Sequence, residues 1–149
     1  MMIETAQRSL REQYPDAQYH FVQFLSEHLV DCARVFEGDL TRMVVLAILG
    51  QSLLAEYRAS GKGGPQRSMT ASRVADVSGL DRETVRRKLK ALAARGWIRQ
   101  IADRSWEIAT DPSGDTKVRR DLDALDARGL ERLARLYVAL RPICEKAKA

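Results

Sequence analysis

The stretch "GLDRETVRRKLKALAARGW", residues 79–97, carries side chains that bind anions. Six of them are basic and two are acidic: Arg82, Arg86, Arg87, Lys88, Lys90 and Arg95 against Asp81 and Glu83. Ammonium and guanidinium groups attract phosphates, and arginine can donate two parallel hydrogen bonds to the edge of a guanine. Solvated helix faces are often equally basic, so charge alone leaves both interpretations open.

The apolar residues of this stretch predict which way its basic residues point. Taking Val85 as the inward direction, an advance of 100° per residue turns Glu83, Arg86, Arg87 and Lys90 to the opposite face. The expected inward positions of the helix pair are Val74, Leu80, Val85, Leu89 and Leu92, with the small Ala75 where the helices cross. We therefore expect a recognition helix over about 81–95.

The outward residues are candidates for DNA contacts. Arg86 and Arg87 are expected to reach base edges and Lys90 a phosphate. Glu83 is expected to accept a hydrogen bond from a cytosine amino group, or to orient Arg87 one turn further on.

The segment before this helix predicts the first half of a helix-turn-helix. Thr70 is suited to cap a helix that runs to about Val77, and Gly79 to reverse the chain after it. Asp81 can then cap the second helix.

The segment after the helix predicts a short β-hairpin. In "WIRQIADRSWEIAT" two β-prone runs flank the polar "ADRS", which places Arg104 at the tip of a wing over 98–108. An arginine there suits a narrow minor groove, and Asp103 is expected to hold it in place. Trp97 and Trp106 are more typical of packing residues than of DNA contacts.

"VADVSGLDRETVRRKLKALAARGWI" followed by "ADRSWEIAT" resembles the winged helix-turn-helix of bacterial transcription regulators of the MarR type. The matching features are Ala75, Gly79, Leu80, Val85, Gly96 to Ile98, Asp103, Arg104 and Thr110, and the resemblance covers roughly 70–110. It implies that Arg104 is the minor-groove arginine of the wing and that terminal helices form a dimer. The wing is shorter than usual for this type, and the glycine-rich loop before the motif is longer.

Together these observations predict a regulator that binds double-stranded DNA and acts on transcription. The candidate DNA-binding residues are Thr70, Ser72, Arg73, Arg82, Glu83, Thr84, Arg86, Arg87, Lys90 and Arg104. The alternative is a winged-helix module that binds protein or RNA, because a fold does not fix a function.

The flanking sequence predicts a mainly α fold: a winged helix-turn-helix core with terminal dimerisation helices. Helical spacing indicates helices over about 16–36, 39–58 and 115–141, the second capped by Asp39 and the third kinked or split at Gly129. The corresponding segments are 1–38, 39–110 and 111–149. The terminal stripes exceed what one small core covers, which predicts a homodimer; the alternative is that these helices fold back on their own domain.

Charge and composition fit this interpretation. The net charge is +5, yet residues 62–106 alone sum to +7, so the basic excess lies in the middle of the chain. The N-terminus lacks an apolar signal region, and Arg42 interrupts the most apolar stretch. A soluble cytoplasmic protein without a membrane partner is therefore expected.

Other chemistry has weaker support in the sequence. We find no phosphate loop, metal-ligand spacing or dinucleotide motif, and therefore expect no catalysis, metal or cofactor. An aromatic cluster on the first helix is either interface packing or a pocket for a small effector of unknown identity: Tyr14, Tyr19, His20, Phe21, Phe24 and His28. Cys32 and Cys144 are expected to be inert, and redox sensing by them is an open alternative.

Overall fold

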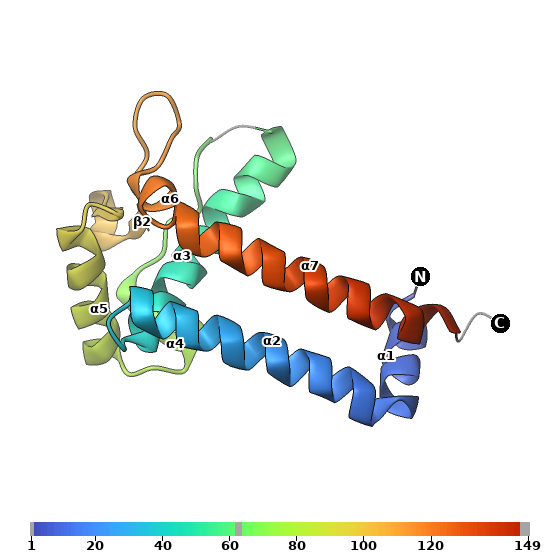
Figure 1. Cartoon of the computed structure of the whole chain (residues 1–149). Helices are drawn as coiled ribbons and strands as arrows, with labels where there is room; N and C mark the ends of the chain where they lie inside the picture. Colours follow the sequence, from blue (N-terminus) through green and yellow to red (C-terminus); the bar gives the residue numbers. More distant parts are fainter. Residues whose placement is uncertain (1, 62–63, 147–149) are drawn as a thin grey trace. The chain divides into compact units, whose positions relative to one another are not determined.

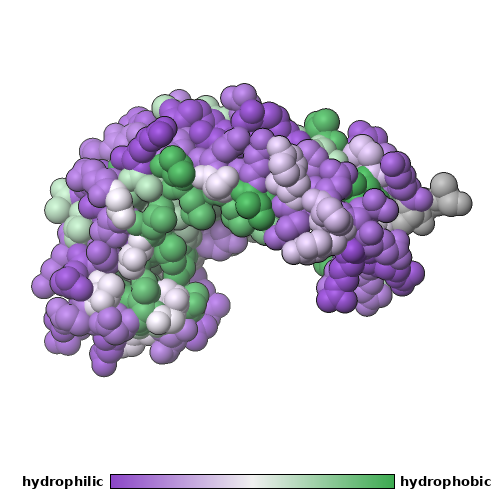
Figure 2. Space-filling model, turned by 60° about the horizontal axis from the view of Figure 1, so that its bottom comes forward, coloured by the Kyte–Doolittle hydropathy of each residue, from purple (hydrophilic) through white to green (hydrophobic). Residues whose placement is uncertain are grey.

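The structure, a computed structural model, describes residues 2–61 and 64–146. It divides into two compact units. Unit 1 comprises Met1–Val35 and Ala124–Ala149, and unit 2 comprises Phe36–Asp123. Figure 2 shows a face on which hydrophilic residues predominate and apolar residues form separate patches.

Unit 1 is helical. Its elements are α1 (Ile3–Glu12), α2 (Tyr14–Val35) and nearly all of α7 (Asp123–Glu145). The two long helices α2 and α7 lie side by side and run in opposite directions (Figure 1). The helix expected over 16–36 is confirmed as α2, whereas α1 was not predicted.

Ion pairs join α2 to α7. Arg128 donates from Nε and Nη2 to the two carboxylate oxygens of Asp31, at 2.8 and 2.9 Å, and Arg132 Nη1 donates to Oδ2 at 2.6 Å. The hydrogen bond from Arg128 lowers the pKa of the Asp31 carboxyl far below its ordinary value, although burial opposes the shift. Asp31 is only 7% exposed, so this charged carboxylate is compensated inside the helix contact.

The expected break at Gly129 is wrong. The helix is interrupted at Leu122, between α6 (Lys117–Asp121) and α7, and Gly129 lies inside α7. A Cβ atom at position 129 would lie 2.9 Å from Cε1 of His28. Glycine at this position thus lets α2 and α7 approach closely, which explains its presence in a helix without a kink.

Unit 2 is a small winged-helix arrangement. Its helices are α3 (Leu40–Ser60), α4 (Ala71–Ser78), α5 (Arg82–Ala94) and α6, with the 3-10 turn η1 (Ala102–Arg104). Strands β1 (Ile98–Gln100) and β2 (Trp106–Ile108) pair antiparallel, with Ile98 opposite Ile108. The expected cap of α3 is confirmed, because the Asp39 carboxylate accepts a hydrogen bond from the backbone N–H of Arg42 at 2.9 Å.

The core of unit 2 forms where α3, α4, α5 and the hairpin meet. Its fully buried residues are Phe36, Val45, Leu49, Val74, Val85, Leu89, Leu92 and Ile108. Helix α3 contacts α4, α5 and β2 and contributes four buried apolar side chains to this core.

Among the residues that the structure describes, α3 is the one helix that is long and apolar enough to cross a membrane, by length and composition only. Helix α3 meets these criteria although Arg42 lies in its first turn, and one such helix is weak evidence for a membrane span. A buried core helix meets the same criteria, and Val45, Leu46, Leu49 and Leu53 are buried in the fold.

Replacing a core leucine of α5 should destabilise unit 2. Leu89→Ala removes a side chain with no exposed area and should lower the free energy of unfolding by about 2–5 kcal/mol. The matched control is Leu54→Ala, because Leu54 is 58% exposed on α3 and its truncation should cost less than about 0.5 kcal/mol. Urea denaturation measures both, and equal losses of stability would contradict this description of the core.

Candidate nucleic-acid interface

The turn between α4 and α5 has the geometry that the sequence predicts. Thr70 caps α4, its Oγ1 accepting from the backbone N–H of Arg73 at 3.2 Å. Gly79 follows α4 with φ 73°, a left-handed conformation that glycine adopts without strain. Asp81 caps α5 by accepting from the backbone N–H of Thr84 at 2.9 Å. The helix-turn-helix is therefore confirmed.

Helix α5 buries the face that the sequence predicts. Val85, Leu89 and Leu92 have no exposed area, and they pack where α5 meets α3 and α4. On the other sides of the helix the predicted site residues Arg82, Glu83, Arg86, Arg87 and Lys90 are exposed. The burial of one face thus presents four cations and one carboxylate to solvent.

The predicted residues at the start of α4 lie close together in the chain and differ in exposure. Thr70 and Arg73 are exposed, and Ser72 is half-buried. They sit in the first turn of the helix, where free backbone N–H groups and the helix dipole favour an anion. This turn is therefore suited to bind an anion.

The orienting role expected of Glu83 toward Arg87 is wrong. Glu83 instead lies 3.8 Å from Arg86, in an exposed pair, and Arg87 Nη2 lies 3.5 Å from Thr84 Oγ1. Thr84 in turn donates from Oγ1 to the Asp81 carboxylate at 2.6 Å. The hydrogen bond from Thr84 lowers the pKa of the Asp81 carboxyl. Asp81 therefore stays charged while it caps α5 and accepts from the Thr84 hydroxyl.

Two of the six basic residues in 79–97 are used inside unit 2. Lys88 donates from Nζ to Asp39 Oδ2 at 2.9 Å, and both side chains are largely buried. Arg95 pairs with Glu37 at 2.8 Å and lies 4.9 Å above the Trp97 ring. Although burial opposes it, the hydrogen bond from Lys88 helps to lower the pKa of Asp39. These cations pair with carboxylates of unit 2 and so hold α5 in place.

The wing has an unusual backbone at its tip. Asp103 and Arg104 have φ values of 70° and 63°, a conformation that residues other than glycine rarely adopt. The expectation that Asp103 holds the Arg104 side chain is wrong, because the Asp103 carboxylate accepts from the backbone N–H of Ser105 at 3.2 Å. Asp103 thus supports the turn, and Arg104 is exposed at its end.

The base of the wing is fixed by side chains of its strands. Arg99 bonds Glu107 across the sheet at 3.0 Å and also donates to the carbonyl of Thr110 at 2.9 Å. Trp97 is buried, as expected, and its Nε1 donates to Asp121 at 2.8 Å. The position of the wing relative to α5 is therefore set by contacts inside unit 2.

Unit 1 holds the aromatic cluster and both cysteines. Phe24 stacks on His28, and both His20 and Phe24 line a cavity of about 220 Å3. Burial raises the pKa of Cys32, whose Sγ lies 3.6 Å from His28 Nε2, so the thiol stays protonated.

Across residues 2–61 and 64–146, no group of three or more acidic, histidine or cysteine side chains is arranged to hold a metal ion.

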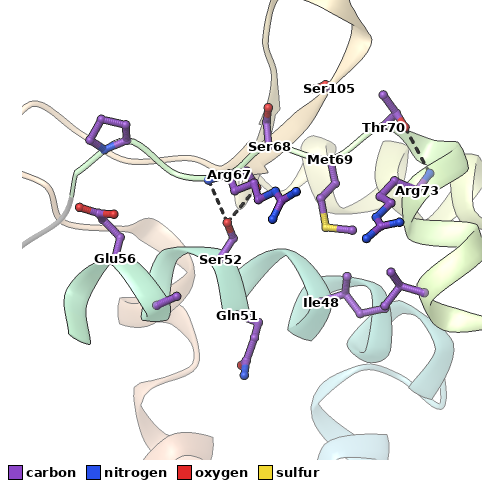
Figure 3. Close-up of a pocket in the computed structure, with 13 residues that line it drawn as sticks. Ile48, Gln51, Ser52, Glu56, Arg67, Ser68, Met69, Thr70, Arg73 and Ser105 are labelled. Atoms are coloured by element: carbon purple, nitrogen blue, oxygen red, sulfur yellow. Dashed lines mark hydrogen bonds between the residues drawn. The ribbon is translucent and has the colours of Figure 1, made fainter. Parts of the chain in front are cut away.

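The structure also contains a groove that the sequence did not predict. It lies between α3, the segment 65–70 and α4, and has a volume of about 790 Å3 (Figure 3). Arg67 and Arg73 extend toward it on either side of Met69. Sequence periodicity could not find this groove, because segments far apart in the chain form it.

The two classes of basic residue on α5 should behave differently on substitution. Lys88→Ala removes the ion-pair partner of Asp39 and should lower the free energy of unfolding by about 1 kcal/mol. Lys90→Ala is the matched control and should leave stability unchanged, because Lys90 is exposed. Urea denaturation without nucleic acid compares them, and an equal effect would contradict the division of roles.

The helix-turn-helix region is similar in sequence to a known protein family. Residues 53–102, about a third of the chain, match the family model of the IclR helix-turn-helix domain. No curated protein and no solved structure matches the chain. The matched segment runs from within α3 to the tip of the wing and contains the whole of α4 and α5.

This similarity decides between the two functions considered. It supports a DNA-binding domain of a transcription regulator over a module that binds protein or RNA. It names the IclR type of helix-turn-helix and does not confirm the MarR type. The winged helix-turn-helix of unit 2 is thus a DNA-binding domain of the kind found in transcription regulators.

Proposed function

We propose that the protein is a sequence-specific transcription regulator of bacterial type that binds promoter DNA in the cytoplasm as a homodimer. Helix α5 enters the major groove, and the wing places Arg104 in the adjacent minor groove. The observation that carries the proposal is the exposed basic face of α5 opposite its buried face. The chain acts by binding and not by catalysis.

The exposed side chains have distinct roles in this proposal. Arg86 and Arg87 contact base edges, because guanidinium groups match the acceptors of guanine. Glu83 accepts from a cytosine amino group. Lys90, Arg82 and the first turn of α4 bind phosphates, which fixes the position of the protein without reading sequence.

Dimerisation is proposed through unit 1. Both long helices expose large apolar side chains at helical spacing: Val22, Leu25 and Leu29 on α2, and Leu130, Leu133 and Tyr137 on α7. Unpartnered apolar faces of this kind are typical of oligomer interfaces. A two-fold pair would present two α5 helices to half-sites about one DNA turn apart, as in the MarR plan.

A charge placed on this face should separate the proposed dimer. The unsubstituted protein should sediment as a dimer at micromolar concentration, and Leu133→Glu should sediment as a monomer, because a carboxylate cannot be buried unpaired at the interface. Leu54→Glu is the matched control on an exposed leucine of unit 2 and should remain dimeric. A monomeric unsubstituted protein would exclude this mode of assembly.

Substitutions on α5 should separate base reading from phosphate binding. The double variant Arg86→Ala, Arg87→Ala should reduce the preference for the selected sequence, by about 1–3 kcal/mol for each bidentate arginine–guanine pair that it removes. Lys90→Ala should weaken binding to all duplexes alike and reduce the salt slope by about 1. Fluorescence anisotropy with labelled duplexes at several salt concentrations measures both effects.

The control for net charge is Arg8→Ala, Arg11→Ala, which removes two exposed arginines from α1. This variant should discriminate between duplexes as the unsubstituted protein does. If the α5 double variant kept its full sequence preference, the proposed recognition helix would be wrong.

A further inference from the structure

The groove between α3 and α4 is long and has an apolar wall. Ile48 and Ala55 line it two helical turns apart on α3, a separation of about 10 Å along the helix axis. Met69 and Val77 add apolar surface from the facing segments. A volume of about 790 Å3 is in the range of small-molecule sites. The length favours an extended chain over a single compact ring.

Several polar groups of the groove are already satisfied by the protein. Ser52 Oγ donates to the carbonyl of Arg67 at 2.8 Å and accepts from its backbone N–H at 2.9 Å. Thr70 Oγ1 accepts from the backbone N–H of Arg73. Figure 3 shows both sets of hydrogen bonds. Ser52 therefore joins α3 to the segment 65–70, and Thr70 caps α4.

The charged groups of the groove are distributed unequally. In the described parts of the chain, Arg67 and Arg73 form hydrogen bonds through their backbone groups, and their guanidinium groups have no ion-pair or hydrogen-bond partner. Glu56 lies at one end of the groove and Arg73 at the other (Figure 3). An anionic head group is thus attracted to the arginine end and repelled from the Glu56 end.

We propose that this groove binds a straight-chain aliphatic carboxylate. Its carboxylate group accepts hydrogen bonds from Arg67 and Arg73, since guanidinium groups match carboxylates in charge and geometry. Its chain lies along Ile48 and Ala55 toward the Glu56 end. Free cations beside an apolar wall complement both halves of such a ligand.

The proposed site overlaps the proposed DNA surface. Thr70 and Arg73 line the groove and also belong to the first turn of α4, which we assign to a phosphate. A carboxylate bound to Arg73 would compete with that phosphate for the same guanidinium. The ligand is therefore expected to weaken DNA binding, a consequence that rests on the proposed function.

Ligand binding is tested on the full chain without DNA. Decanoate, kept below its micelle concentration, is titrated against protein with labelled methionine methyl groups, with 1-decanol as the neutral comparison. Decanoate should shift the Met69 methyl signal and bind at least about tenfold more tightly than decanol, because charged hydrogen bonds form only with the carboxylate. Met69→Leu assigns the signal.

Arginine variants locate the head group. Arg67→Gln, Arg73→Gln should abolish the preference for decanoate, while the matched control Arg8→Gln, Arg11→Gln on α1 should keep it. Equal affinity for decanoate and decanol, an unmoved Met69 signal, or an unchanged preference in the groove variant would each overturn the proposal.

A second experiment tests the link to DNA. Decanoate should reduce the duplex affinity of the unsubstituted protein and should not reduce further that of Arg67→Gln, Arg73→Gln. An unchanged duplex affinity in the unsubstituted protein would overturn the competition. If the protein binds no duplex at all, the proposed function fails, and the methyl titration still decides the site.

Discussion

The burial of Val85, Leu89 and Leu92 against α3 and α4 is the constraint on which the functional surface depends. A helix with one apolar stripe has one stable orientation on a core, because turning it would expose that stripe to water. Once this orientation is fixed, the positions of Arg86, Arg87 and Lys90 follow from helix geometry. The distribution of apolar and basic residues along α5 therefore determines both how the helix packs and which cations it exposes.

Ion pairs also hold α5 in its orientation on the core. Asp39 caps α3 and also binds Lys88 of α5, so one carboxylate links the start of α3 to α5. Arg95 stacks on Trp97 and pairs with Glu37 at the end of α5. Basic residues that look alike in the sequence therefore divide into two that anchor the helix and four that remain exposed.

Local signals in the sequence predicted the helix-turn-helix well. The caps at Thr70 and Asp81, the turn at Gly79 and the inward residues of α5 depend on neighbours within a few residues, and the structure confirms them. The wing was found for the same reason. Boundaries and pairings that depend on distant residues were predicted less well.

The errors have physical explanations. Gly129 suggested a break in the helix, but its role is to admit His28 from α2, a residue far away in the chain. Asp103 and Glu83 were expected to contact the neighbouring arginines Arg104 and Arg87. In the structure the Asp103 carboxylate accepts from the backbone N–H of Ser105, and Glu83 pairs with Arg86. The groove beside α4 is lined by segments far apart in the chain, and no single stretch carries a signal for it.

Selection of bound duplexes from a random DNA library is the most direct test of the central claim that α5 reads DNA sequence. We predict enrichment of one motif, repeated with two-fold symmetry and with half-site centres about one helical turn apart. Failure of the full-length protein to enrich any duplex sequence would contradict this claim.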